Sequence, residues 1–153
     1  MADLSFATHL CTFHTDYEAT AVGLQAMLEG LGSNIIKHLG NVELGKALRI
    51  FLQDEQGKVV GGISGDLFGG WVYISLLWVD KSLRNLGYGS GLLQRLEAEA
   101  IGLGCKYAHV DTYSFEARPF YERAGYEVFG VLDNYPPGHQ KYFLKKSLVR
   151  AAA

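Results

Sequence analysis

Several features common in secreted, membrane and nucleic-acid-binding proteins are missing from this sequence. It has only two cysteines, Cys11 and Cys105, and no CxxC pair, so a disulfide framework is not expected and both thiols are predicted to be buried and inert. The longest apolar run, residues 67–79, is shorter than the ~20 residues that a membrane span needs. The N-terminal segment has no cationic region before an apolar stretch, which disfavours a secretory signal. We therefore expect a cytoplasmic protein with no membrane partner.

An excess of charge of either sign is also missing. The formal net charge is −2 over 153 residues, so no basic excess indicates a nucleic-acid partner and no acidic block indicates a disordered tail. Hydrophobic residues make up 48% of the chain and charged residues 20%, which is ordinary globular composition. No linker or repeat divides the chain. These observations predict one domain over residues 1–150 with a proper core.

The first part of the chain predicts helices and then a hairpin. Apolar residues at helical spacing predict a helix over residues 16–29, which the stretch GLGSN ends before a short apolar segment at 35–39. Apolar runs at 47–54 and 58–68 flank an acidic, glycine-containing turn and predict a β-hairpin. The run 71–79 is rich in β-branched and aromatic residues and predicts a buried central strand.

After residue 79 the hydrophobic period alternates between strand and helix. The pattern predicts an amphipathic helix from about 89 to 103 and a short helix within 115–125. Strands are expected at 106–113, 126–132 and 140–148. A strand–helix–strand crossover inside a largely antiparallel arrangement predicts an α/β fold of the α+β type, with a mixed sheet and helices on both faces.

The segment RNLGYGSGLL, residues 84–93, stands out because it opens a helix with glycines. Backbone N–H groups at a helix start have no partner within the helix, and the helix dipole places partial positive charge there. Glycines let a phosphate approach the backbone, and Arg84 can add charge-assisted hydrogen bonds. The segment therefore predicts a diphosphate site.

Two common diphosphate motifs do not fit. A dinucleotide fingerprint needs a third glycine where this chain has Leu92, and a P-loop needs Gly-Lys-Ser/Thr, which is absent. The pattern that does fit is Arg-x-x-Gly-x-Gly, formed by Arg84, Gly87 and Gly89.

With this pattern the chain resembles the GNAT superfamily of acetyl-CoA-dependent N-acetyltransferases. The strand end LLWVD stands where the family has its signature valine, five residues before the arginine. The later stretch SFEARPFYERAGYEVFG is similar to the family motif N-x-x-A-x-x-F-Y-x-x-x-G-F, through Ala117, Phe120, Tyr121, Gly125 and Tyr126. The resemblance covers about residues 45–148. The chain departs from the family at three positions, namely Lys81 for proline, Asn85 for glycine and Ser114 for asparagine.

The resemblance implies a single-domain GNAT-like fold in which two splayed strands hold coenzyme A. It implies that the backbone of the central strand's end pairs with the pantetheine arm, that residues 84–90 hold the pyrophosphate, and that Ala117 and Phe120 line the thioester end. The implied cofactor-binding residues are Leu77, Trp78, Val79, Arg84, Asn85, Leu86, Gly87, Tyr88, Gly89, Ser90, Ser114, Ala117, Phe120 and Tyr121.

The implied reaction is direct attack of an amine on the thioester of acetyl-CoA. The backbone N–H of Val79 is the implied oxyanion donor, and Tyr121 is the implied general acid for the departing thiolate. For the base, strand alternation places His109 and Asp111 on one face. Asp111 is a candidate base through water, His109 and His139 are alternatives, and a purely structural role for Asp111 stays open.

No metal is expected. His9, Cys11 and His14 lie close in sequence, but their spacing matches no standard metal site. The resemblance places the acceptor groove at about residues 23–39 and the loop before the last strand, and the nine tyrosines and two tryptophans can line that pocket or belong to the core. The expected function is N-acetylation of a primary amine of a small molecule or peptide. The alternative is an inactive acyl-CoA-binding or regulatory module on the same fold, and a homodimer is possible.

Overall fold

The computed structural model describes residues 11–19, 21–40 and 45–149. The N-terminal segment considered as a signal, and with it His9, lie outside these ranges. Residues 1–42 and 43–153 form two compact units, and each is described by itself. The expectation of one domain over 1–150 stays a prediction.

Within residues 11–19 and 21–40, the first unit contains one helix, α1 (Ala21–Leu39). The predicted helix end at GLGSN is wrong, because the helix continues through Gly30 and Gly32. A glycine costs a helix about 1 kcal/mol relative to alanine but does not force an end, and the Ser33 hydroxyl donates to the Glu29 carbonyl one turn back. The helix stops at Gly40, where the backbone adopts φ +75°. Left-handed glycine is the common helix terminator.

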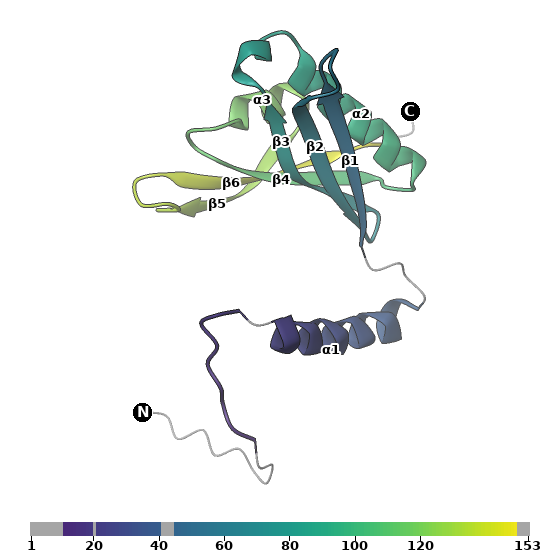
Figure 1. Ribbon diagram of the computed structural model, residues 1–153, viewed down its shortest axis with the longest axis vertical. Helices are drawn as coiled ribbons and strands as arrows, with labels where there is room; N and C mark the ends of the chain where they lie inside the picture. Colours follow the sequence, from purple (N-terminus) through teal and green to yellow (C-terminus); the bar gives the residue numbers. More distant parts are fainter. Residues whose placement is uncertain (1–10, 20, 41–44, 150–153) are drawn as a thin grey trace. The chain divides into compact units, whose positions relative to one another are not determined.

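The second unit is built on one six-stranded sheet in the order β1-β2-β3-β4-β6-β5 (Figure 1). Only β3 and β4 run parallel, and the other neighbouring pairs are antiparallel. The mixed sheet predicted from the sequence is therefore confirmed. The strands are β1 (Lys46–Gln53), β2 (Val59–Phe68), β3 (Trp71–Val79), β4 (Tyr107–Tyr113), β5 (Glu127–Asp133) and β6 (Gln140–Ser147).

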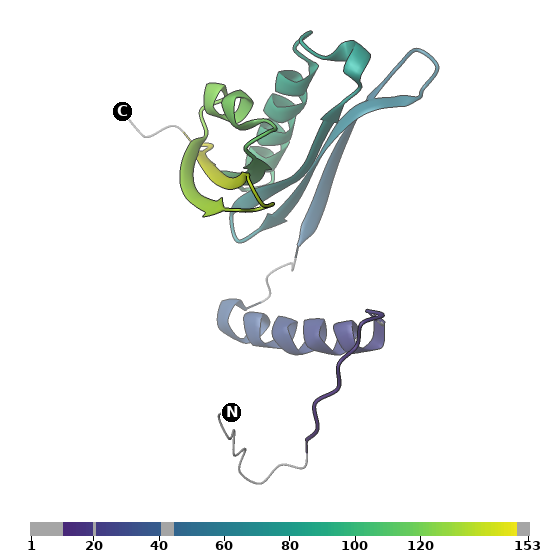
Figure 2. The same ribbon diagram turned by 90° about the vertical axis from the view of Figure 1, so that its left-hand side faces the viewer.

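Two helices of this unit pack on the same face of the sheet, and the expectation of helices on both faces stays a prediction. Helix α2 (Tyr88–Gly102) is the crossover between β3 and β4 and buries Leu92, Leu93, Leu96 and Ala100. Figure 2 shows it running along the sheet. The short helix α3 (Arg118–Arg123) adds Tyr121 to the same core cluster. Gly65 on β2 permits this close approach, because a Cβ there would lie 2.8 Å from the Val72 side chain and 3.1 Å from that of Leu96.

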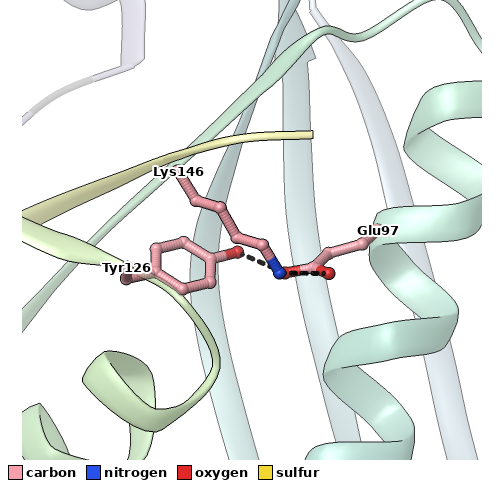
Figure 3. A network of polar contacts seen from close by, with 3 residues as sticks. All are labelled: Glu97, Tyr126 and Lys146. Atoms are coloured by element: carbon pink, nitrogen blue, oxygen red, sulfur yellow. Dashed lines mark hydrogen bonds and ion pairs between the residues drawn. The ribbon is translucent and has the colours of Figure 1, made fainter. Parts of the chain in front are cut away.

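A group of polar contacts, called the tie, joins α2 to β6 (Figure 3). The Lys146 Nζ on β6 donates to both carboxylate oxygens of Glu97 on α2 at 2.9 Å, and the Tyr126 hydroxyl donates to one of them at 2.9 Å. Burial, followed by the charge of Glu97, raises the pKa of Tyr126 well above its usual value. The hydroxyl therefore stays protonated and remains a donor.

The two cysteines differ. Cys105 is buried, and burial raises the pKa of its thiol, as expected for an inert core residue. Cys11 is exposed, so the expectation of burial is wrong for that residue. In the described part of the chain, no helix is long and apolar enough to span a membrane.

Candidate active site

The parallel strands β3 and β4 separate halfway along their length. Their pairing runs from Trp71–Tyr107 to Ile74–Val110 and stops there. At the next residue β3 carries a β-bulge against β2, where Ser75 is the extra residue and its hydroxyl donates to the Ser64 carbonyl. A bulge bends its strand and increases the local twist. The bend coincides with the point where β3 leaves β4, and it opens a gap between them.

The antiparallel β2–β3 ladder decides which backbone groups face this gap. The N–H of Asp80 donates to the Val60 carbonyl at 2.8 Å, which makes these residues a hydrogen-bonded pair. Bonded and non-bonded pairs alternate along such a ladder. Trp78 therefore directs its backbone groups toward β2, whereas Leu77 and Val79 direct theirs toward the gap.

A cavity of about 630 Å³, which we call the cleft, occupies the gap. The Nε of Arg84 donates to the Val79 carbonyl at 3.1 Å at its edge, so the N–H of Val79 is the group that remains directed at the cleft. The cleft is lined by residues 74–79 of β3, Arg84, residues 110–112 of β4, Phe115, Glu116, Ala117 and Tyr121.

A second cavity of about 570 Å³, the cradle, lies at the start of α2. The N-cap Gly87 has φ +89° and Asn85 has φ +62°, so the chain turns sharply before the helix and presents the backbone of its first turn. A Cβ on Gly89 would lie 3.6 Å from the Phe120 ring. Arg84 and Arg123 add positive charge to the lining. The cradle combines unpaired helix N–H groups, the helix dipole and two cations, which is the chemistry that a diphosphate requires.

Cleft and cradle are connected. They share six lining residues, namely Leu77, Val79, Arg84, Glu116, Ala117 and Tyr121. Most of the residues assigned from the sequence line one or both cavities. Leu86 and Ser114 line neither: Leu86 is exposed, and Ser114 exchanges hydrogen bonds with the backbone of Gln140 at the start of β6.

Tyr121 lies where the two cavities meet. Tyr121 is 4% exposed, and it reaches this position from the short helix α3, which ends at Arg123 and is followed by the left-handed Gly125. Burial raises the pKa of Tyr121 strongly, and the charges of Glu116 and Asp111 raise it further. The phenol is therefore protonated at every ordinary pH and can act as a hydrogen-bond donor and acid.

Asp111 lines the cleft but is already engaged. Its Oδ2 accepts a hydrogen bond from the Tyr73 hydroxyl at 2.7 Å, and Lys141 Nζ lies 3.2 Å from its Oδ1. The hydrogen bond to Asp111, with burial, raises the pKa of Tyr73 to about 12. His109 stacks on Tyr73 and lines neither cavity, and burial lowers its pKa, so it is neutral near pH 7.

Glu116 is a site residue that sequence reasoning missed. It lines both cavities, and its carboxylate accepts one long hydrogen bond, from the Thr112 hydroxyl at 3.4 Å. Its charge is the largest electrostatic contribution to the raised pKa of Tyr121. Arg123 was also missed. Both residues flank matched positions of the later motif, and this proximity was the available signal.

His139 lies in the loop before β6, beside the cleft lining. Its ring packs edge-to-face on Phe115, with 4.8 Å between centroids, and its Nδ1 lies 3.4 Å from the Ser114 hydroxyl. Among the described residues there is no group of three metal-ligating side chains. Cys11 and His14 are both exposed.

Comparison with known proteins defines the class of this fold and site. A family model described as "Acetyltransferase (GNAT) family" matches residues 27–126. The chain belongs to the GNAT acetyltransferase family, and it is an acyltransferase of that class.

Two relatives are matched over most of their own length. Blasticidin-S acetyltransferase of Streptomyces morookaense is 40% identical over 95 residues, which cover 61% of this chain and 70% of the relative. The acetyltransferase Atu2258 of Agrobacterium fabrum is 34% identical over 99 residues, which cover 65% of this chain and 72% of the relative.

Solved structures share the fold. An acetyltransferase from Bacillus cereus superimposes with a TM-score of 0.79 at 30% identity, over 88% of this chain and 97% of that one. An aminoglycoside 6'-N-acetyltransferase complexed with coenzyme A superimposes with a TM-score of 0.64 at 17% identity, over 92% and 98% of the two chains. The GNAT resemblance and the fold class inferred from the sequence are therefore confirmed.

Proposed function

We propose that this protein transfers the acetyl group of acetyl-CoA to a primary amine of a small molecule or peptide by direct attack. The observation that carries the proposal is the connection of the cleft with the cradle. The buried Tyr121 and Val79 line both cavities, and the start of α2 lines the cradle. The Streptomyces relative is named as an acetyltransferase of blasticidin S, which supports acetyl transfer as the reaction.

The residues present fit acetyl-CoA. The N–H groups from Gly87 to Ser90, with Arg84 at the rim, hold the pyrophosphate. Beyond the bulge, Leu77 and Val79 have no strand partner on the side of the cleft. The backbone groups of Leu77, and the Val79 carbonyl through its second lone pair, pair with the pantetheine amides in the way that an added strand pairs with a sheet edge. Ala117 and Phe120 line the thioester end.

Two groups act on the reacting atoms. The N–H of Val79 donates to the carbonyl oxygen of the acetyl group as negative charge develops there, and it is preorganised because β3 holds it in place. The Tyr121 hydroxyl gives its proton to the departing sulfur. That transfer is a modest demand, since a thiol has a reference pKa of ~8.5.

The base is proposed at the cleft. The attacking amine must be neutral, and Asp111 can receive its proton through water, although its Oδ2 already accepts a hydrogen bond from Tyr73 and its Oδ1 is paired with Lys141. Glu116 forms no ion pair among the described residues and is the second candidate. His109 and His139 lie outside the linings of both cavities. A cytoplasmic location and a homodimer complete the proposal.

The test is an acceptor screen with acetyl-CoA against polyamines, aminoglycosides, amino acids and lysine peptides, with release of free CoA as the signal. We expect turnover with at least one primary amine, and thermal stabilisation by acetyl-CoA greater than that by ADP or NAD. Stabilisation by acetyl-CoA with no turnover on any amine would favour an inactive binding module. Stabilisation by ADP or NAD alone would reassign the cradle to another diphosphate.

A further inference from the structure

An aromatic cluster borders the cleft at the end of β4. The rings of Tyr113 and Phe115 stack with 5.4 Å between centroids and 9° between planes. Tyr135, in the loop before β6, tilts against Tyr113 at 5.9 Å, and His139 packs on the edge of Phe115 at 4.8 Å. Phe115 is 57% exposed and Tyr135 is 46% exposed. We call Tyr113, Phe115, Tyr135 and His139 the aromatic wall.

The aromatic wall belongs to the side of the cleft that faces away from the cradle. Phe115 and Asp111 line the cleft and not the cradle, whereas Tyr121 and Val79 line both. The acyl donor enters from the cradle and ends at the shared residues. The side marked by Phe115 is consequently the side left for the acceptor.

The position that a cation would take on these rings is already filled. Lys141 Nζ lies 4.9 Å from the centroid of Tyr135, 5.6 Å from that of Tyr113 and 5.5 Å from that of Phe143. The same ammonium group is paired with the Asp111 carboxylate, which offsets its charge. A second cation at this point would be repelled by the ammonium group of Lys141. The exposed ring surfaces of Phe115 and Tyr135 remain, and they suit a flat, unsaturated group that stacks.

We propose that the aromatic wall binds a planar ring of the acceptor, so that the preferred substrate is a small-molecule amine bearing an aromatic or heteroaromatic ring. Phe115 is the specificity-determining residue, since it is the member of the wall that lines the cleft. This inference rests on the proposed N-acetyltransferase function and adds the class of acceptor to it.

The test compares 2-phenylethylamine with 2-cyclohexylethylamine, which differ in the planarity of the ring. For the native protein we expect kcat/KM to favour the planar amine about fivefold, within the range of a single aromatic contact. Phe115→Leu should bring this ratio close to one and leave the KM for acetyl-CoA unchanged. Phe129→Leu is the matched control, because Phe129 is 55% exposed on β5 and lines neither cavity. It should leave the ratio as it is.

Binding without turnover separates this inference from the function beneath it. Line broadening of each amine in ligand-observed NMR, with CoA present, reports the wall even if no acetylation occurs. Preferential broadening of the planar amine that Phe115→Leu removes supports the aromatic wall. Equal broadening or equal kcat/KM for the two amines, or a preference that survives Phe115→Leu, overturns it. Turnover of both amines at equal rates overturns the wall while N-acetylation stands.

Discussion

Two tyrosines of the core show how position decides the use of one side-chain type. Tyr121 and Tyr126 are 4% and 3% exposed, and their rings are 5.6 Å apart. The hydroxyl of Tyr126 is committed to Glu97, away from the connected cavities, whereas Tyr121 lines both of them. Burial raises both pKa values, so both hydroxyls remain protonated, but only Tyr121 can give its proton to a reacting group.

Replacing Tyr121 with phenylalanine should lower kcat about 10²-fold and change the KM for acetyl-CoA little, because the lost hydroxyl is the proposed proton donor to the leaving thiolate. In the native protein the rate should rise with pH as the acceptor amine deprotonates. Because the pKa of Tyr121 lies above its ordinary value of 10.0, ionisation of Tyr121 should not lower the rate at any pH below 10. The measurement is a steady-state pH–rate profile.

Tyr126→Phe is the control for losing a buried phenol in the same cluster. It should lower the free energy of unfolding through the lost bond to Glu97 and leave kcat nearly unchanged. An unaltered kcat in Tyr121→Phe would remove the acid role from this residue.

At the scale of elements, the site depends on two local irregularities. The bulge at Ser75 bends β3 away from β4 and leaves backbone groups of the strand without a partner. The left-handed glycine at position 87 turns the chain into α2, so that the helix starts with its N–H groups directed at the cradle. Without the bulge, β3 would not leave an open backbone edge beside β4. Without the turn at position 87, the N–H groups of α2 would not be directed at the cradle.

Replacing Gly87 with glutamate should raise the Kd for acetyl-CoA at least tenfold. The new carboxylate would stand at the start of α2, where the diphosphate is proposed to bind, and like charges repel there. The space around Gly87 is open, with no atom within 4 Å of a Cβ, so the variant should fold. Its left-handed φ of +89° would cost about 1 kcal/mol of stability. Calorimetric titration with acetyl-CoA measures the affinity.

The matched control is Gly57→Glu. Gly57 lies in the β1–β2 turn with φ +79° and equally open surroundings. Both variants should lose similar stability, and only Gly87→Glu should lose affinity. Unchanged affinity in folded Gly87→Glu would show that the cradle has been misplaced.

On the scale of the 43–153 unit, the tie between Glu97 and Lys146 joins the crossover helix to β6. Helix α2 contacts β1, β2 and β3, while α3, β5 and β6 belong to the other half of the sheet. Because β3 pairs with β4 only from Trp71–Tyr107 to Ile74–Val110, contacts on the covered face add to what holds the two halves together. The Glu97 side chain is 12% exposed and the Lys146 side chain is 24% exposed, so this ion pair is substantially shielded from water.

Lys146→Met should lower the free energy of unfolding by about 2 kcal/mol, because it leaves the Glu97 carboxylate shielded from water with only the Tyr126 hydroxyl as a partner. Urea denaturation measures the loss. Lys145→Met is the control: its pair with Glu127 is 3.7 Å long and exposed, and should contribute less than about 1 kcal/mol.

The triple variant Glu97→Leu/Lys146→Met/Tyr126→Phe should recover most of the loss, since it removes both charges and the hydroxyl that bonds to Glu97. Equal losses for Lys145→Met and Lys146→Met would contradict a special role for the tie.

Much of the fold and part of the candidate site could be predicted from local pattern. Hydrophobic periods of two and of three to four residues located the strands and the helices α2 and α3, because each period reflects which residues face the core. The glycines before α2 and the stretch around Tyr121 indicated an anion site and an acyltransferase, since both depend on short segments of backbone. The same reasoning placed a false helix end at Gly30, because glycine weakens a helix without requiring it to stop.

The tertiary structure decided what depends on residues far apart in the chain. Lys141 lies thirty positions after Asp111 and engages its carboxylate across the β4–β6 pair, and no local pattern indicates that contact. The same holds for Glu116 between the two cavities and for the aromatic wall built from β4 and the loop before β6. The sequence by itself determined the order of elements and the kind of chemistry. Only the folded sheet decided which carboxylates remain available and where an acceptor ring can stack, because these depend on cross-strand neighbours.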